Sequence, residues 1–326
     1  MISNRTFLFD QPHTLLQKVV DQVAKVVVGK RDAIEKSVIA MLCGGHVLLE
    51  DVPGVGKTLL VRSLAATIGC GYKRIQCTPD LMPSDITGVS VFQPQTAAFE
   101  FRPGPIMNPV VLADELNRAL PRTQAAFLEA MEERSVTVDG VTYELPKPFL
   151  LLATQNPLDH EGTYPIPEAQ LDRFLMKLSL GYPEHGDEVG MLEQQLQRRS
   201  EGSLRPVLMQ EEWVQLQSEA ATVNVDESLR EYIVSLAGAT RRHPDLRLGA
   251  SPRASAALMR AAQARALMQG RRYVVPDDIK CLAVPVFAHR LLPSTDALIG
   301  GRTPQAAVEA AVASVPIPVL RFAAVR

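Results

Sequence analysis

One stretch of this sequence decides its fold: Leu48-Leu49-Glu50-Asp51-Val52-Pro53-Gly54-Val55-Gly56-Lys57-Thr58. It joins an apolar strand pattern to the start of a helical pattern through a glycine-rich loop. In this arrangement backbone N–H groups at the helix N-terminus cradle phosphates, the lysine reaches the β- and γ-phosphate oxygens, and the threonine hydroxyl binds Mg²⁺. Glycine lets the backbone approach the anion because it has no Cβ. The stretch therefore predicts a phosphate-binding loop.

One position departs from the formal pattern of this loop, because Asp51 replaces the first glycine. Aspartate tolerates left-handed backbone angles better than most residues, so we expect Asp51 to make the same turn. A chance Gly-Val-Gly-Lys-Thr sequence in an ordinary loop is the alternative. That alternative loses support if other parts of a nucleotide site accompany the loop.

The acidic pair Asp114-Glu115 is such a part, because it ends an apolar strand pattern over residues 110–113. We expect Asp114 to hold Mg²⁺ through water, and Glu115 to orient and deprotonate the water that attacks the γ-phosphate. Acidic residues also suit the N-terminus of a helix, which is the structural alternative. With a phosphate-binding loop on an earlier strand, we prefer the catalytic interpretation.

Short, continuous apolar runs alternate with helical patterns through the first half of the chain. Continuous hydrophobicity indicates strands that are covered on both faces, and the alternation predicts a doubly wound α/β domain with a parallel, five-stranded sheet. Ligands of such sheets bind outside the carboxyl ends of the strands. The expected strands are residues 46–50, 74–77, 109–113, 149–153 and 174–178, and the expected helices are residues 32–43, 58–68 and 123–133.

Two segments interrupt this alternation. Residues 78–109 are too long for a simple connection, and long connections in compact domains are usually functional. Residues 135–143 place apolar residues alternately on either side of Asp139-Gly140, which predicts a tight β-hairpin.

The character of the sequence changes after Tyr182-Pro183, where helical patterns replace the alternation. We therefore expect an α/β domain over residues 1–183 and a small all-α domain over residues 184–326. Asp226 and Ser251 stand at expected N-caps, and Pro252 and Pro276 suit first helical positions. The expected helices are residues 211–222, 226–241, 252–268, 276–288 and 304–314.

The composition argues against several classes of protein. The chain has 326 residues, 46% hydrophobic and 21% charged, with a formal net charge of −2, so charge gives no attraction to nucleic acid or anionic membrane. Residues 1–28 lack a signal-peptide pattern, and no apolar run reaches the roughly 18 residues that would cross a bilayer. The cysteines show no metal-ligand spacing, so we expect packed, reduced thiols and a cytoplasmic protein. They are Cys43, Cys70, Cys77 and Cys281.

The order of these motifs resembles the AAA+ ATPases, and specifically the MoxR family. The resemblance covers nearly the whole chain, and six ordered motifs are more specific than any one of them. They are LLEDVPGVGKT (residues 48–58), TPDLMPSDITG (78–88), ADELNRA (113–119), ATQNP (153–157), EGTYPIPEAQLDRF (161–174) and GASPRA (249–254).

The resemblance implies roles for three further residues. Asn156 resembles the sensor-1 residue that holds the attacking water, although an Asn-Pro turn also explains it. Arg173 resembles an arginine finger supplied to a neighbouring subunit, an effect worth about 10³–10⁵-fold in rate in related phosphoryl transfer. An ion pair with Asp172 or Glu168 is the alternative. Arg253 resembles sensor 2, since a solvated cation at a helix N-terminus would be unfavourable.

The resemblance also implies the remaining parts of the site. Val28-Gly29 resembles the segment that lines the adenine pocket, although a plain turn before a helix explains it nearly as well. Residues 78–109 resemble the helix-2 insert and residues 135–143 the pre-sensor-1 hairpin, both of which face the pore of a ring. Gln76 is a candidate polar switch for Glu115. The expected ATP/ADP-binding residues are Val28, Gly29, Pro53, Gly54, Val55, Gly56, Lys57, Thr58 and Leu59, with Mg²⁺ at Thr58 and Asp114.

The implied function is ATP hydrolysis by a hexameric ring that remodels protein partners, in complex assembly or cofactor maturation. A partner with a von Willebrand factor A domain is part of this expectation. The alternatives are a magnesium-chelatase-like motor subunit, a nucleic-acid motor, which the acidic balance disfavours, and a scaffold that binds ATP without turnover. A transcription-activator function is disfavoured because the expected Gly-Ala-Phe-Thr-Gly-Ala loop is absent from the insert region.

Overall fold

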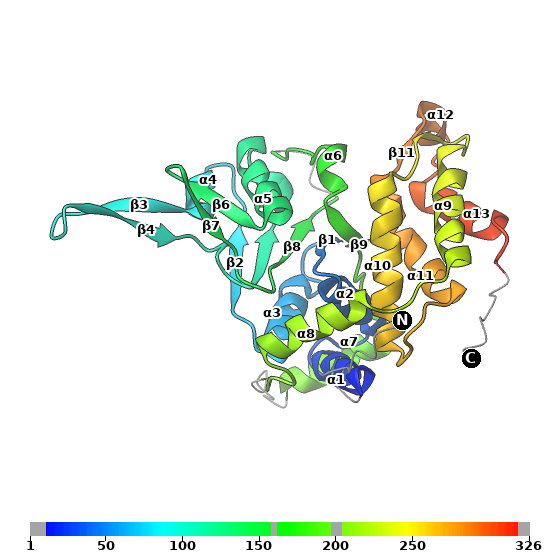
Figure 1. Cartoon of the computed structure of the whole chain (residues 1–326), viewed down its shortest axis with the longest axis horizontal. Coiled ribbons are helices and arrows are strands. Elements are labelled where there is room, and N and C mark those ends of the chain that lie inside the picture. The colour runs from blue at the N-terminus through cyan, green and yellow to red at the C-terminus, as the bar shows by residue number, and fades with distance from the viewer. Residues whose placement is uncertain (1–10, 158–161, 197–203, 319–326) are drawn as a thin grey trace, which may run out of the picture. The chain divides into compact units, whose positions relative to one another are not determined.

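The computed structural model describes residues 11–157, 162–196 and 204–318 (Figure 1). Their contacts divide the chain into two compact units. The sheet unit comprises residues 17–174 and 178–214, and the helical unit comprises residues 1–16, 175–177 and 215–326. Within the described residues, no helix combines the length and the apolar composition that crossing a bilayer requires.

A five-stranded sheet with the strand order β2-β5-β8-β1-β9 is the framework of the first unit. Neighbouring strands β2 and β5, β5 and β8, and β1 and β8 pair in parallel. The predicted doubly wound α/β fold is confirmed, and each strand lies within two residues of its predicted bounds. The strands are β1 His46–Glu50, β2 Tyr72–Gln76, β5 Val110–Asp114, β8 Leu150–Gln155 and β9 Phe174–Leu178.

The central strands are apolar throughout because both of their faces are covered. Every residue of β5 is buried. Val111 and Ala113 pack into one core cluster with Phe127 and Leu128 of helix α5, Pro121–Glu133. Helix α3, Lys57–Thr67, lies on the opposite side of the sheet from α5 (Figure 1). The continuous hydrophobic runs in the sequence follow from this double burial.

The helices α2, α3 and α5 confirm the three predicted for this unit. A further helix, α7, was not expected from the sequence. The helices are α2 Arg31–Leu42, α3 Lys57–Thr67, α4 Pro83–Thr87, η1 Leu116–Arg118, α5 Pro121–Glu133, α6 Glu168–Leu171 and α7 His185–Leu196.

The division into units differs from the predicted boundary after residue 183. Described residues between 184 and 214 belong with the sheet, and the backbone N–H of Val207 donates to the Thr67 carbonyl of α3 at 2.8 Å. This hydrogen bond ties the segment to the end of α3. Contacts of this kind do not test where one folding domain ends and the next begins, so the predicted domain boundary stays a prediction. Two helices cross the division, α1 Pro12–Ala24 and α8 Gln210–Ala221.

The long segment after β2 forms helix α4 and a β-hairpin of strands β3 Gly88–Gln93 and β4 Ala98–Pro103. Figure 1 shows this hairpin extending away from the five-stranded sheet. Phe92 and Phe99 face each other across the two strands with ring centroids 5.4 Å apart, and are 50% and 74% exposed. Nearer the sheet, Phe101 stacks on Tyr143 at 3.9 Å.

That tyrosine belongs to the second predicted hairpin, which is confirmed as strands β6 Ser135–Val138 and β7 Val141–Glu144. Asp139 and Gly140 form its turn with φ of 51° and 79°. Both angles are positive, as a two-residue hairpin turn with the twist of its strands requires.

The helical unit is mostly helical, as predicted, and the predicted caps are confirmed. The Asp226 carboxylate accepts from the Ser228 N–H at 2.9 Å, and the Ser251 hydroxyl oxygen accepts from the Ala254 N–H at 3.1 Å. A two-stranded sheet and helix α12 were not expected. The elements are α9 Glu227–Arg241, β10 Leu246–Leu248, α10 Pro252–Met268, α11 Pro276–Phe287, η2 Ala288–Arg290, β11 Leu292–Pro293, α12 Thr295–Ile299 and α13 Pro304–Ser314.

The cysteines follow the expected packing only in part. Cys70 and Cys77 are buried, and burial raises the pKa of each thiol to about 12. Cys281 is exposed, which the apolar residues around it in the sequence did not predict.

Candidate active site

The loop between β1 and α3 has the backbone geometry of an anion cradle. Gly54 and Gly56 adopt φ of 86° and 93°, and a Cβ built on either would meet no atom within 4 Å. The space above the loop is therefore open. Gly56 is the N-cap of α3, and no side chain among the described residues caps this helix. Its first N–H groups consequently face a space that a phosphate would fill.

Asp51 serves a different purpose from the one expected. It is not among the described residues with positive φ, so the prediction that it makes a left-handed turn was wrong. Its carboxylate accepts hydrogen bonds from the Ser179 hydroxyl at 2.7 Å, the Leu180 N–H at 2.6 Å and the Gly181 N–H at 3.1 Å. Asp51 therefore joins the end of β1 to the segment that follows β9.

Lys57 is the first residue of α3, and a backbone carbonyl at the start of the loop holds its side chain over the loop. Its Nζ donates to the Asp51 carbonyl at 2.6 Å. Burial lowers the pKa of Lys57, whereas the negative charges of Asp51, Asp114 and Glu115 oppose that change. The parallel order β5-β8-β1 places the carboxyl ends of β1 and β5, and therefore the loop and the acidic pair, at the same edge of the sheet.

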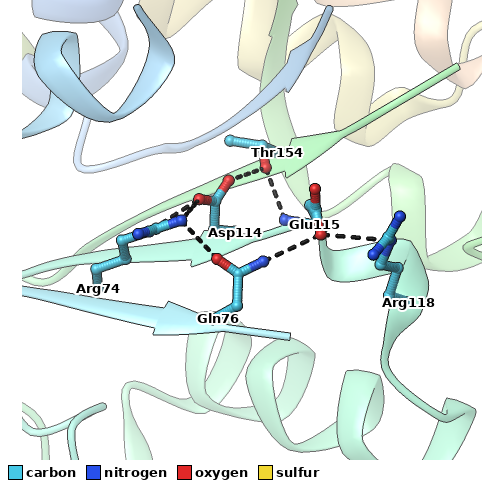
Figure 2. A network of polar contacts seen from close by, with 6 residues as sticks. All are labelled: Arg74, Gln76, Asp114, Glu115, Arg118 and Thr154. Carbon is cyan, nitrogen blue, oxygen red and sulfur yellow. Dashed lines mark hydrogen bonds and ion pairs between the residues drawn. The ribbon is translucent and has the colours of Figure 1, made fainter. Parts of the chain in front are cut away.

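Asp114 ends β5 and is only 8% exposed. Its Oδ1 accepts from the Thr154 hydroxyl at 2.6 Å, and its Oδ2 accepts from Nε and Nη2 of Arg74 at 2.9 and 2.6 Å. Thr154 Oγ1 also accepts from the Glu115 N–H at 2.7 Å. The neighbouring strands β2 and β8 thus orient this carboxylate from both sides (Figure 2).

Glu115 follows Asp114 with φ of 57°, which turns the chain sharply out of β5. Its Oε2 accepts from Gln76 Nε2 at 3.0 Å and lies 3.3 Å from Nε of Arg118. Gln76 Oε1 in turn accepts from Arg74 Nη2 at 2.5 Å. Figure 2 shows a continuous chain of contacts from Asp114 through Arg74 and Gln76 to Glu115.

The structure places two residues assigned by resemblance next to the sheet. Asn156 follows β8 directly and is 7% exposed. Arg173 directly precedes β9, and its Nη2 lies 2.8 Å from Oε2 of Glu132 in α5. Glu132 was not expected as its partner. Glu161, the first residue of the motif that contains Arg173, lies outside the described residues. The roles of Asn156 and Arg173 remain predictions.

Arg253 is the second residue of α10, in the helical unit, two positions after the N-cap Ser251. Its sensor-2 role also remains a prediction.

Val28 and Gly29 lie just before α2, as expected for a turn that precedes a helix. Gly29 has φ of 72°, and a Cβ built on it would lie 1.9 Å from Oδ2 of Asp187 in α7. A side chain at position 29 would require this carboxylate to move, and the positive φ itself favours glycine. The adenine-pocket role of the segment is a prediction that the contact with α7 does not test.

Four residues of this site were missed by the sequence reasoning: Arg74, Arg118, Thr154 and Asp187. Thr154 stands in the quoted ATQNP motif and Arg74 on the same strand face as Gln76, so a strand period of two was an available signal. Nothing local in the sequence indicates that Asp187 reaches Gly29.

The donor set fits Mg²⁺ in a nucleotide complex. The Thr58 hydroxyl and the Asp114 carboxylate offer oxygen atoms, which Mg²⁺ prefers, and Mg²⁺ usually keeps several waters and binds substrate phosphates. Among the described residues, no group of three or more His, Cys, Asp or Glu side chains could hold a metal ion on its own.

Comparison with known proteins agrees with this geometry. Residues 46–176 match the ATPase family associated with various cellular activities (AAA), and residues 238–313 match the AAA lid domain. The chain is 39% identical to Chaperone MoxR1 of Mycobacterium tuberculosis, over 94% of this chain and 83% of that protein. It is 31% identical to Protein MoxR of Paracoccus denitrificans, over 90% and 93% of the two chains.

Two further relatives cover almost the whole chain. The uncharacterized protein YeaC of Bacillus subtilis is 53% identical over 95% of this chain and 97% of its own length. A solved structure of a candidate ATPase from Cytophaga hutchinsonii superposes with a TM-score of 0.88 at 38% identity, covering 94% of this chain and 96% of that one. The fold, the loop and the ordered motifs agree with these matches, and the chain belongs to the MoxR family of AAA+ ATPases.

Proposed function

We propose that this chain hydrolyses ATP with Mg²⁺ and uses the reaction to remodel protein partners. One observation carries the catalytic part. The parallel order β5-β8-β1 sets the open, glycine-lined loop with Lys57 at the same edge of the sheet as Asp114 and Glu115. A cationic phosphate ligand, a metal-side carboxylate and a general base in one place are what phosphoryl transfer to water needs.

The residues divide the chemistry between them. Residues 53–59 cradle the phosphates, and Lys57 reaches the β- and γ-phosphate oxygens. Thr58 and Asp114 hold Mg²⁺, which neutralises charge on the phosphates when it is bound. Glu115 orients the attacking water and accepts its proton. Val28 and Gly29 line the adenine end of the site.

Gln76 is the switch for Glu115 in this proposal. Glu115 Oε2 accepts from Gln76 and faces Arg118, so these donors hold the atom that must accept the proton. A base engaged by two donors is a poor proton acceptor. Release of Gln76 would therefore activate Glu115.

The other assigned residues make the site a shared one. Asn156 holds the attacking water, Arg173 stabilises the transferring phosphoryl group of a neighbouring subunit, and Arg253 reports the nucleotide state to the helical unit. An arginine supplied by a neighbour requires assembly, so the proposal includes an oligomer, and the family resemblance favours a hexameric ring.

The remodelling part rests on different support. One relative is named a chaperone, and the β3–β4 hairpin exposes an aromatic pair that would suit contact with a protein client. The MoxR names of the relatives favour this function over a magnesium-chelatase motor. A partner with a von Willebrand factor A domain follows from the family resemblance alone.

The catalytic part is tested with Glu115→Gln. We expect phosphate release from Mg-ATP to fall by about 100-fold or more, because a general base contributes about 10²–10⁴ in rate, while ATP binding is retained. Glu133→Gln is the matched control, because it makes the same chemical change at the exposed end of α5. Equal turnover by wild type and Glu115→Gln would overturn the proposed hydrolysis.

A further inference from the structure

Arg74 holds the carboxylate that the proposed function assigns to Mg²⁺. Both of its contacts, through Nε at 2.9 Å and Nη2 at 2.6 Å, are to Oδ2 of Asp114. The other oxygen, Oδ1, accepts from the Thr154 hydroxyl at 2.6 Å. Both oxygens of Asp114 are therefore engaged (Figure 2).

This arrangement creates a competition for one atom. A carboxylate that holds a hydrated Mg²⁺ must accept hydrogen bonds from the metal's water ligands. Thr154 keeps Oδ1 and also orients the Glu115 backbone, so its hydroxyl is fixed from two sides. Oδ2 already accepts both hydrogen bonds from Arg74, so a water ligand that approaches Oδ2 competes with the guanidinium. A guanidinium and a hydrated divalent ion carry charge of the same sign and repel each other.

The Arg74 side chain has room to move away from Asp114. Arg74 lies on β2, which is one of the two edge strands of the sheet, and its side chain is 48% exposed compared with 11% for Asp114. The guanidinium can turn into solvent without crossing another strand. Its departure would also remove the donor to Gln76 Oε1, in the side chain that donates to Glu115.

We propose that Arg74 is a placeholder cation for the metal site. It neutralises Asp114 before nucleotide arrives and is displaced from Oδ2 when Mg²⁺ enters with the nucleotide. Arg74 thereby raises the Mg²⁺ concentration that nucleotide binding requires. Its displacement frees Gln76 and so links metal entry to the state of Glu115. This inference rests on the proposed binding of Mg-nucleotide.

The test is a Mg²⁺ titration of nucleotide binding, which needs no turnover. Binding of a fluorescent ADP (N-methylanthraniloyl-ADP) is followed as MgCl₂ is added to protein stripped of metal with EDTA. For Arg74→Gln we expect the half-saturating Mg²⁺ concentration to fall by about three- to fivefold, the scale of a partly exposed ion pair. Arg74→Lys keeps the charge and stays near wild type. In EDTA, Arg74→Gln binds the nucleotide no more tightly than wild type does.

Lys73→Gln is the matched control. Lys73 is the exposed neighbour of Arg74 on β2, and its side chain points to the opposite face because strand side chains alternate. It removes the same charge without touching Asp114, so we expect no shift in the Mg²⁺ requirement. Arg74→Met retains most of the aliphatic stem and serves as a second neutral variant if Arg74→Gln folds poorly.

The outcomes separate the two proposals. An unchanged or higher Mg²⁺ requirement in the neutral Arg74 variants would overturn the placeholder role and make Arg74 an orienting partner of bound metal. An equal shift of the Mg²⁺ requirement in Lys73→Gln would show that the shift comes from the overall charge of the protein. This result would also overturn the placeholder role. If wild type itself shows no Mg²⁺-dependent nucleotide binding, the proposed function fails instead.

Discussion

At the scale of single residues, the structure gives a physical reason for Asp51, which replaces the first glycine of the phosphate-binding loop pattern. A glycine there would supply backbone freedom, but Asp51 supplies a carboxylate that accepts from Ser179, Leu180 and Gly181. Hydrogen bonds to a charged group are worth about 1.5–3 kcal/mol each. The side chain thus fixes the start of the loop to the segment after β9, while its carbonyl holds Lys57.

His46 carries a prediction about pH at the same scale. It is 4% exposed, its Nδ1 accepts from the Leu151 N–H at 3.0 Å, and its Nε2 lies 3.2 Å from the Met131 carbonyl. A neutral ring with the proton on Nε2 satisfies both contacts. Burial lowers the pKa of His46 from 6.5 to about 3.

Because the folded pKa of His46 lies below the unfolded one, the unfolded chain binds the proton first. The free energy of unfolding should therefore fall as pH drops below 6.5, by about 1.4 kcal/mol per pH unit from this group until pH approaches its folded pKa. Urea unfolding at pH 7 and pH 5 measures it. His46→Gln retains one donor and one acceptor but does not titrate, so its stability should change less. Parallel pH profiles would contradict the assignment.

At the scale of elements, the joint between α10 and α11 depends on one buried charge. Asp278 is fully buried, accepts from the Val275 N–H at 2.9 Å, and forms ion pairs with Arg265 and with Arg271, the latter at 2.7 Å. Its hydrogen bond raises the pKa of Arg271. The carboxylate therefore joins the end of α10 to the start of α11.

Asp278→Asn should lower the free energy of unfolding by about 3 kcal/mol or more, because it leaves two guanidinium groups without a counter-charge. Urea unfolding followed by circular dichroism measures the change. Asp277→Asn is the control: this neighbour is exposed at the same helix start, and its substitution should cost about 0.5 kcal/mol or less. Similar losses in both variants would mean that the buried pairs are not what stabilises the joint.

The β3–β4 hairpin carries a second prediction at this scale. Phe92 and Phe99 are its exposed aromatic pair. If they contact clients, the double variant Phe92→Ser/Phe99→Ser should weaken binding of fluorescent β-casein, used as an unfolded-protein probe, by about tenfold in a Glu115→Gln background with ATP. Fluorescence anisotropy measures this binding.

The control for the hairpin is Val89→Ser. Val89 is 43% exposed on the opposite face of the same strand, since it pairs with Arg102 and stands an odd number of residues from Phe92. Its substitution in the same background should leave casein binding unchanged. Undiminished casein binding by the double phenylalanine variant would exclude the aromatic pair as a client contact.

At the scale of the whole molecule, the proposed role of Arg173 predicts complementation between inactive variants. In the proposed oligomer, a site without its own Glu115 would be inactive, and so would a site whose neighbour lacks Arg173. A mixture of Arg173→Ala with Glu115→Gln contains interfaces where an intact Glu115 meets an intact Arg173. We expect phosphate release from the mixture to exceed the sum of the two variants alone.

The matched control in that mixture is the double variant Glu115→Gln/Arg173→Ala, which supplies neither group. Titrating it into Arg173→Ala should give no gain. No gain from Glu115→Gln either would mean that Arg173 does not act between subunits, and that its pairing with Glu132 of α5 is its structural role.

Much of the fold followed from local patterns in the sequence. The continuous apolar runs predicted the five strands, because a strand buried on both faces has no polar face to alternate. The Asp139-Gly140 pair predicted a hairpin because its turn needs two positive φ angles. Helix α7 was missed, since His185-Gly186-Asp187 begins it without a strong N-cap or first-position proline.

The candidate site likewise combines residues that the sequence predicted with contacts that only the tertiary structure shows. The sequence by itself determined the loop, Lys57, Thr58 and the Asp114-Glu115 pair, because these residues are neighbours along the chain and their chemistry depends on spacing. Only the tertiary structure decided that Asp51 binds residues after β9, that Arg74 occupies Oδ2 of Asp114, and that Glu132 pairs with Arg173. Each of these contacts joins residues about forty or more positions apart. Sheet order and helix packing bring them together, and no local pattern carries that information.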